Sequence, residues 1–77
     1  MIATSVFRVI NNIRVIREHR NVSKLALSEK LGLSEFAYDL IEQGERKLTL
    51  EELFMIAYIL DVDYTLLLEN NLVMLLT

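Results

Sequence analysis

The segment from Ser23 to Lys47 constrains the fold of this chain more than any other part of the sequence. It contains two short amphipathic stretches of helical pattern, joined only by Gly32-Leu33-Ser34. A glycine at this point can take the left-handed conformation that ends one helix, and a serine two residues later can cap the next. Because the connection is so short, the chain must reverse direction sharply. The segment therefore predicts two helices that cross at a steep angle.

Apolar residues recur at helical spacing along almost the whole chain, which has no proline and only two glycines. We expect a first helix from about Val6 to Arg20, followed by Asn21 in the left-handed position that ends helices. The inward-facing residues of this helix are predicted to be Val6, Phe7, Ile10, Ile13 and Ile16. The next two helices begin after Ser23 and Ser34, and their inward-facing residues are predicted to be Leu27, Leu31, Ala37, Tyr38 and Ile41.

Two further helices are predicted downstream. Thr49-Leu50-Glu51-Glu52 has the form of a capping box, and the helix that it opens should bury Leu53, Ile56, Ala57 and Leu60. Asp63 can cap a fifth helix through Leu66 and Leu67, with a continuation toward Leu76. We therefore expect an all-α protein, folded as a single compact five-helix domain over residues 1–77.

The composition argues against several classes of site. With no cysteine and one histidine, neither a metal site nor any other cofactor is expected. His19 stands among charged residues and is interpreted as solvated, and no nucleophile lies near a plausible base, so we expect no enzyme. No segment approaches the roughly 20 apolar residues of a membrane span, and the charged stretch Arg8–Arg20 does not fit a signal peptide. A cytoplasmic protein with no membrane partner is expected.

The net charge of −3 is unevenly distributed along the chain. Residues 1–33 carry six basic and two acidic side chains, whereas residues 34–77 carry two basic and nine acidic ones. Binding to a polyanion depends on local positive potential and not on the total charge. The placement of these charges therefore decides whether the chain can bind nucleic acid.

Taken together, these features resemble the phage-repressor-type helix-turn-helix family, the lambda-repressor-like or Cro-type proteins, over roughly residues 12–69. The residues that carry the resemblance are Ile13, Ile16, Arg17, Leu27, Leu31, Gly32, Leu33, Ser34, Ile41-Glu42-Gln43-Gly44, Leu50, Leu53, Ile56, Ala57, Leu60, Asp61 and Val62. The resemblance implies a compact fold of five helices. It also implies a repressor-like transcriptional regulator that binds duplex DNA as a homodimer, with the helix over residues 35–43 in the major groove.

The resemblance also implies roles for individual residues. Arg17 and Glu42 match an arginine and a glutamate that form a structural ion pair between the first and third helices. Lys24, directly after the cap of the second helix, matches a phosphate-contacting position, and Arg46 and Lys47 match further phosphate contacts in the following loop. The alternative for these basic residues is a solvated surface turn. The positions that would read bases are Glu35, Phe36, Ala37, Asp39 and Leu40.

The expected reading helix departs from the family pattern, because Ser34 to Gln43 contains three acids and no base. Phosphates repel carboxylates, and a glutamate can gain a base contact only by accepting from a cytosine amino group. Phe36 and Leu40 can pack on a thymine methyl, and Glu35 can instead favour the helix dipole.

The same helix supports an alternative function. Leu25, Phe36 and Leu40 would form an exposed apolar patch beside Lys24 unless one or two of them fold back onto the core. Contiguous apolar surface favours a protein contact. The alternative is therefore a protein-interaction module on a helix-turn-helix scaffold, which binds a protein partner through this helix instead of DNA.

The ends of the chain are unusually apolar. Residues 70–77 form a C-terminal extension beyond the predicted core, and its apolar residues are Leu72, Val73, Met74, Leu75 and Leu76. Val9, Val15 and the first seven residues add further unassigned apolar surface. Because terminal segments without a partner are seldom so apolar, we expect the extension to form a homodimer interface. The alternative is a tail that folds against its own first helix.

Overall fold

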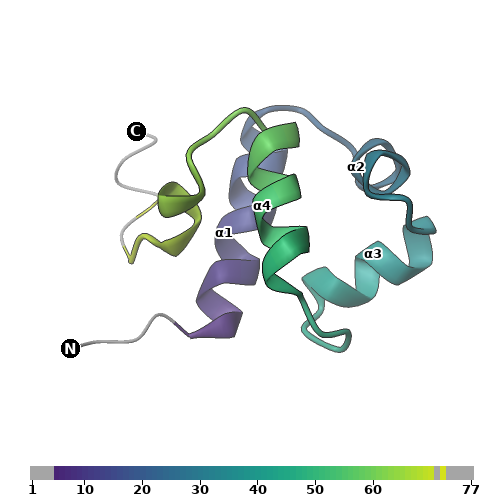
Figure 1. The fold of residues 1–77 in the computed structure, drawn as a ribbon, viewed down its shortest axis with the longest axis horizontal. Coiled ribbons are helices and arrows are strands. Elements are labelled where there is room, and N and C mark those ends of the chain that lie inside the picture. The colour runs from purple at the N-terminus through teal and green to yellow at the C-terminus, as the bar shows by residue number, and fades with distance from the viewer. Residues whose placement is uncertain (1–4, 71, 73–77) are drawn as a thin grey trace.

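The computed structural model describes residues 5–70 and 72. Within these ranges the elements are α1 (Val6–His19), α2 (Lys24–Leu31), α3 (Glu35–Glu42), α4 (Leu50–Ile59) and the 3-10 helix η1 (Tyr64–Leu68). In Figure 1, α2 and α3 lie on one side of α1 and α4, and η1 lies on the other side. α2 contacts both α3 and α4, and η1 contacts both α1 and α4. The expectation of an all-helical domain is confirmed for this part of the chain.

The predicted helix boundaries are confirmed at their caps. The side chains of Ser23 and Ser34 accept hydrogen bonds from the third backbone N–H that follows each of them, both at 3.0 Å. Thr49 and Glu52 cap α4 reciprocally, with both hydrogen bonds at 3.0 Å. Asn21 takes the predicted left-handed conformation after α1, with φ of 57°. Local sequence therefore sets where these helices begin and end.

The prediction of five α-helices is wrong in its last element. The described residues form four α-helices, and the segment that Asp63 caps is the five-residue 3-10 helix η1. The buried side chain of Asn12 on α1 donates to the carbonyl oxygens of Leu67 and Glu69, both at 2.8 Å. An α-helix that continued past this point would need those carbonyls for its own hydrogen bonds. The contact with α1 therefore ends the helix early.

The core is formed by one buried cluster to which every element contributes. Its members are Val9, Ile13, Ile16, Leu27, Tyr38, Ile41, Leu53, Ile56, Ala57, Leu60, Leu67 and Leu72. Ile10 is also buried, whereas Leu31 and Ala37 are only half-buried.

The predicted inward row of α1 is wrong in its first turn. Val6 and Phe7 are exposed, and Val9, which the pattern left unassigned, is buried instead. Val6 borders a shallow surface groove with Leu48 and Leu50, and the ring of Phe7 lies against Gly44. The first turn of α1 therefore lies over the loop between α3 and α4 and not over the core.

Leu72 packs within its own subunit. Its side chain is only 2% exposed and belongs to the core cluster. The guanidinium of Arg8 on α1 donates to the carbonyl oxygen of Asn70 at 2.8 Å, so the chain just before Leu72 is tied to α1. Leu72, which was expected at a dimer interface, is thus buried against its own chain, and the dimer interface itself stays a prediction. The described residues do not include Val73, Met74, Leu75 and Leu76.

None of the helices in the described ranges is long and apolar enough to cross a membrane.

Candidate nucleic-acid interface

The corner between α2 and α3 has the geometry that the sequence predicts. Gly32 ends α2 with φ of +74°, and the backbone N–H of Leu33 donates to the carbonyl oxygen of Ser28 at 2.9 Å. Ser34 then caps α3 in an extended conformation. A residue other than glycine at position 32 would be strained by this backbone, although no atom lies within 4 Å of its Cβ position. The corner holds α3 against α2 and leaves one side of α3 in solvent (Figure 1).

The inner side of α3 is fixed by a buried polar network. The Arg17 guanidinium donates to both carboxylate oxygens of Glu42, from Nε at 2.7 Å and from Nη2 at 3.1 Å. Arg17 also donates to the carbonyl oxygen of Val22, and the Tyr38 hydroxyl donates to Glu42. The hydrogen bond to Glu42 raises the pKa of Arg17, and burial followed by the same carboxylate raises the pKa of Tyr38. Arg17 and Glu42 thus form the ion pair that the resemblance implies, and it joins α1 to α3.

The outer side of α3 carries a second, exposed polar cluster. The Lys24 ammonium on α2 donates to Oδ1 of Asp39 at 2.5 Å, and the Gln43 amide donates to Oδ2. The hydrogen bond from Lys24 holds the pKa of Asp39 below its ordinary value, and the carboxylate raises the pKa of Lys24. Glu35 and Phe36 border a shallow groove with this pair. One of the acids on the reading helix is therefore neutralised by the lysine predicted to bind phosphate.

The other predicted base-reading residues differ in exposure. Phe36 is 73% exposed and Glu35 is also exposed, whereas Ala37 and Leu40 are half-buried. Leu25 on α2 is 50% exposed. The apolar patch predicted from three residues therefore consists mainly of Leu25 and Phe36, because Leu40 turns partly toward the protein.

The loop after α3 holds the remaining predicted phosphate contacts. Nη1 of Arg46 lies 3.3 Å from Oε2 of Glu52, the carboxylate that also caps α4. Burial acts to raise the pKa of Glu52, but the hydrogen bonds from Thr49 and Arg46 outweigh it and lower that pKa. Lys47 is exposed and forms no ion pair within residues 5–70 and 72. Two of the three predicted phosphate contacts are thus paired with carboxylates of their own chain.

The charges over this surface nearly cancel. Three positive charges come from Lys24, Arg46 and Lys47, and four negative ones come from Glu35, Asp39, Glu45 and Glu52. Sequence analysis did not identify Gln43 as a partner of Asp39, although its spacing of four residues on one helix is a recognisable signal. The pairing of Lys24 with Asp39 depends on the angle between α2 and α3, which local patterns do not define.

The rest of the described chain offers little for other chemistry. His19 is exposed at the end of α1. Across residues 5–70 and 72, no three acidic or histidine side chains come close enough together to hold a metal ion.

A comparison with known families agrees with this geometry. Residues 13–67, more than two thirds of the chain, match the model of the helix-turn-helix family of Cro/C1 type. No curated protein and no solved structure matches the chain significantly. The matched range contains the corner, the Arg17–Glu42 pair and the whole outer side of α3. The chain therefore belongs to the Cro/C1-type helix-turn-helix family, a family of DNA-binding regulators.

Proposed function

We propose that this chain is a transcriptional regulator that binds duplex DNA as a homodimer, with residues 35–43 in the major groove. The observation that carries the proposal is the exposed outer side of α3, directly beyond a tight helix-turn-helix corner and beside the N-terminus of α2. A helix held in this way enters the major groove with its N-terminal residues against base edges.

Phosphate contacts are assigned to Lys24, Arg46 and Lys47. The Lys24 ammonium donates one hydrogen bond to Asp39 and has two further protons to offer. It stands beside the first turn of α2, where backbone N–H groups and the helix dipole favour an anion. Exposed ion pairs contribute little net stability, so Lys24 and Arg46 can turn to a phosphate at small cost. Lys47 forms no ion pair within the described residues, so it can contact a phosphate without leaving a carboxylate.

Base contacts are assigned to Glu35, Phe36, Ala37, Asp39 and Leu40. Glu35 and Asp39 can accept hydrogen bonds from cytosine amino groups, and Phe36 can pack on a thymine methyl. The half-buried Ala37 and Leu40 offer smaller apolar contacts. This set predicts a preference for cytosine and thymine on the contacted strand.

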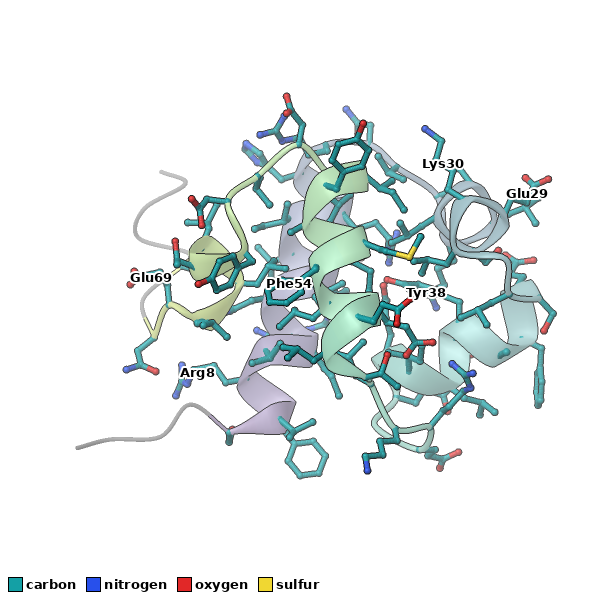
Figure 2. All side chains as sticks on the ribbon, viewed as in Figure 1. Arg8, Glu29, Lys30, Tyr38, Phe54 and Glu69 are labelled. Atoms are coloured by element: carbon teal, nitrogen blue, oxygen red, sulfur yellow. The ribbon has the colours of Figure 1, made fainter. Side chains whose placement is uncertain are left out.

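A salt titration tests the DNA-binding part of the proposal. Fluorescence anisotropy on a random duplex should show that affinity falls steeply as NaCl rises, with a log–log slope of about −2.5 per protomer if all three cations contact phosphate. Lys47→Ala should reduce the slope by about 1. Arg8→Gln is the matched control, because Arg8 lies near η1 and far from α3 (Figure 2), and it should leave the slope unchanged. No binding even at low salt would refute the proposal.

A selection from a random duplex library tests the homodimer and the groove. We expect a two-fold symmetric site whose half-sites lie about one DNA turn apart. Phe36→Ser should relax the base preference within each half-site while the salt slope stays the same. A single, asymmetric site would contradict binding as a symmetric dimer.

A protein-interaction module is the second candidate function. It is favoured by the exposure of Phe36 on α3 and of Leu25 on α2 and by the pairing of Lys24 and Arg46 with internal carboxylates. Large exposed aromatic side chains are typical anchors of protein interfaces. If the chain binds no duplex at low salt, and Phe36→Ser abolishes a complex with a protein, this candidate replaces DNA binding.

A further inference from the structure

α4 exposes four large apolar side chains away from the candidate interface. Leu50, Phe54 and Tyr58 are spaced four residues apart and therefore line one side of the helix, with Met55 beside them. Leu50 is 66% exposed and Tyr58 is 86% exposed. Aromatic residues and methionine are enriched at the centres of protein interfaces. This set of four residues, the α4 stripe, has no role in the function proposed above.

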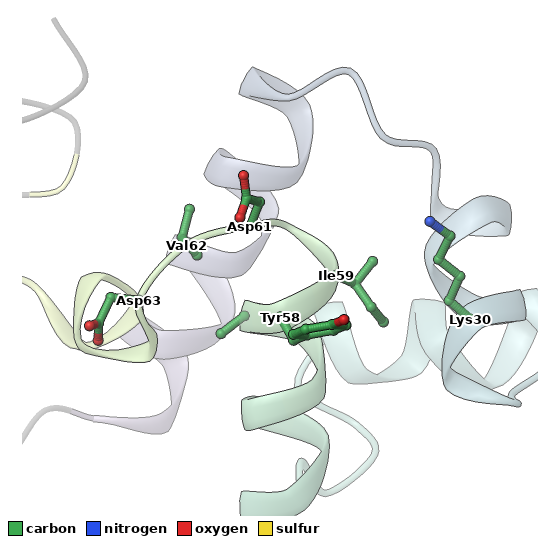
Figure 3. A pocket seen from close by; sticks show the side chains of 7 residues that line it. Lys30, Tyr58, Ile59, Asp61, Val62 and Asp63 are labelled. Atoms are coloured by element: carbon green, nitrogen blue, oxygen red, sulfur yellow. The ribbon is translucent and has the colours of Figure 1, made fainter.

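Three members of the α4 stripe, Phe54, Met55 and Tyr58, line a groove of about 440 Å³ that has one charged side chain at each end. Glu51 contributes from the first turn of α4, and Lys30 contributes from α2; the apolar lining comes from Phe54, Met55, Tyr58 and Ile59. Figure 3 shows Lys30 across from Ile59 and Tyr58, at the C-terminal end of α4. Within the described ranges, neither Lys30 nor Glu51 forms an ion pair. A negative and a positive group thus flank an apolar centre.

We propose that the α4 stripe binds a second copy of this chain, with the two α4 helices antiparallel about a two-fold axis. The helix runs from Leu50 to Ile59, so an axis at its midpoint passes between Phe54 and Met55. Those two residues then meet their own counterparts at the centre of the contact. Leu50 of each copy packs near the C-terminal end of the other α4.

The charges of Glu51 and Lys30 favour a second copy of this chain as the partner of the α4 stripe. The axis brings Glu51 of one copy to the C-terminal end of the other α4, where Lys30 lies, and it does so twice. A two-fold contact requires a self-complementary surface, and opposite charges placed symmetrically about an apolar centre meet that requirement. The antiparallel arrangement also sets the two helix dipoles in opposite directions. Phe54 is held in place for the contact by an edge-to-face packing on Tyr64, with ring centroids 5.0 Å apart.

The α4 contact leaves the candidate DNA interface uncovered. None of its residues belongs to α3 or to the loop that contains Arg46 and Lys47. The inference rests on the homodimer of the proposed function and gives its location, but it does not depend on DNA binding. Its test is therefore made in the absence of DNA.

Sedimentation equilibrium of the full chain without DNA is the first test. The wild-type chain should be a dimer that dissociates on dilution, and Tyr58→Glu should raise the dissociation constant at least about tenfold. Phe36→Ser, which removes a similarly exposed aromatic side chain from α3, is the matched control and should leave the dissociation constant unchanged. Circular dichroism checks that each variant is folded. A wild-type chain that stays monomeric to about 1 mM, or a dimer that Tyr58→Glu does not weaken, would overturn the inference.

A charge exchange tests the antiparallel geometry directly. Lys30→Glu alone and Glu51→Lys alone each place like charges together across the two-fold axis, so each variant should dimerise weakly. In an equimolar mixture, every cross-subunit pair of the mixed dimer again has opposite charges, and dimerisation should return. Because each protomer still carries its own like charges, recovery in the mixture can only come from contacts between copies. No recovery would overturn the inference, whereas a dimer that fails to bind DNA would refute only the DNA-binding proposal.

Discussion

α3 and α4 are similar in length and both bury apolar side chains in the core, but only α3 is also held by a buried polar network. α3 ends in Glu42, a carboxylate whose side chain is only 4% exposed and which is bound by Arg17 and Tyr38. Its outer side carries the Lys24–Asp39 pair. α4 buries only apolar side chains, and its outer side is also apolar, with its charges confined to the first turn.

This difference shows how the two helices divide the work of the domain. Hydrogen bonds to a buried charge are directional, so any shift of α3 would leave Arg17 or Glu42 without its partner. Apolar burial has no direction and fixes α4 less strictly, but apolar side chains left in water favour further burial. The polar network thus suits a helix that must present its outer side at a fixed angle. The apolar stripe suits a helix that has a partner on both sides.

The largest effect should come from breaking the network that holds α3. Glu42→Ala leaves Arg17 buried without its carboxylate and removes the acceptor of the Tyr38 hydroxyl. We expect the free energy of unfolding to fall by about 3–5 kcal/mol, measured by urea denaturation. Glu29→Ala on the exposed side of α2 is the matched control, because Glu29 forms no ion pair in the described structure, and it should change the free energy of unfolding by less than about 0.5 kcal/mol.

A second pair of variants separates the two charges of that network. Arg17→Met combined with Glu42→Leu removes both charges and should recover part of the stability that Glu42→Ala loses. If Glu42→Ala costs no more than Glu29→Ala, α3 is held by apolar burial in the same way as α4, and the contrast between the helices fails.

A smaller effect is expected from the caps, where the two helices are alike. Ser34→Ala and Thr49→Ala each remove a hydroxyl that accepts a backbone hydrogen bond at 3.0 Å. Each should lower the free energy of unfolding by about 1 kcal/mol, because in Thr49→Ala the backbone N–H of residue 49 can still donate to the Glu52 carboxylate and only the hydroxyl acceptor is lost. Thermal unfolding followed by circular dichroism measures both. A much larger loss at Ser34 would mean that the stability of α3 depends on its end as well as on its buried network.

The features that the sequence predicted correctly are those that depend on a few neighbouring residues. The caps at Ser23, Ser34 and Thr49 and the left-handed residues at Asn21 and Gly32 follow from backbone geometry and side-chain chemistry within four residues. The buried rows of α3 and α4 follow from helical periodicity, because each helix has only one side against the core.

The features that the sequence did not predict depend on contacts between elements. Phe7 has the spacing of a core residue, but the first turn of α1 extends past the core and onto Gly44. The 3-10 form of η1 depends on Asn12, which is 55 residues away from Leu67 in the sequence. At the candidate site, the residue types were read correctly as acidic and basic, but their pairing across α2 and α3 was not. Periodicity describes one helix at a time and cannot show which charges two helices bring together.

The smallest expected effect concerns the Lys24–Asp39 pair on the outer side of α3. Because the hydrogen bond from Lys24 lowers the pKa of Asp39, the carboxylate is charged in the folded protein at every pH above its ordinary pKa of about 4. Any stability from the pair is therefore complete above that pH and is lost as the pH falls through the lower, folded pKa. The difference in stability between the wild-type chain and Asp39→Asn should be constant from about pH 5 to 8 and should vanish in more acidic solution.

The same variant separates structure from DNA binding at neutral pH. Asp39→Asn removes the carboxylate that Lys24 must leave to reach phosphate, so the affinity for random duplex should rise. The log–log salt slope should stay unchanged, because Lys24 contacts phosphate in both proteins. Glu35→Gln removes a carboxylate from the same helix without freeing a lysine, because Glu35 has no ion pair in the described structure. It should raise the affinity for DNA by less. If Asp39→Asn raises the affinity no more than Glu35→Gln does, Lys24 reaches phosphate without leaving Asp39, and the pair belongs to the bound state as well.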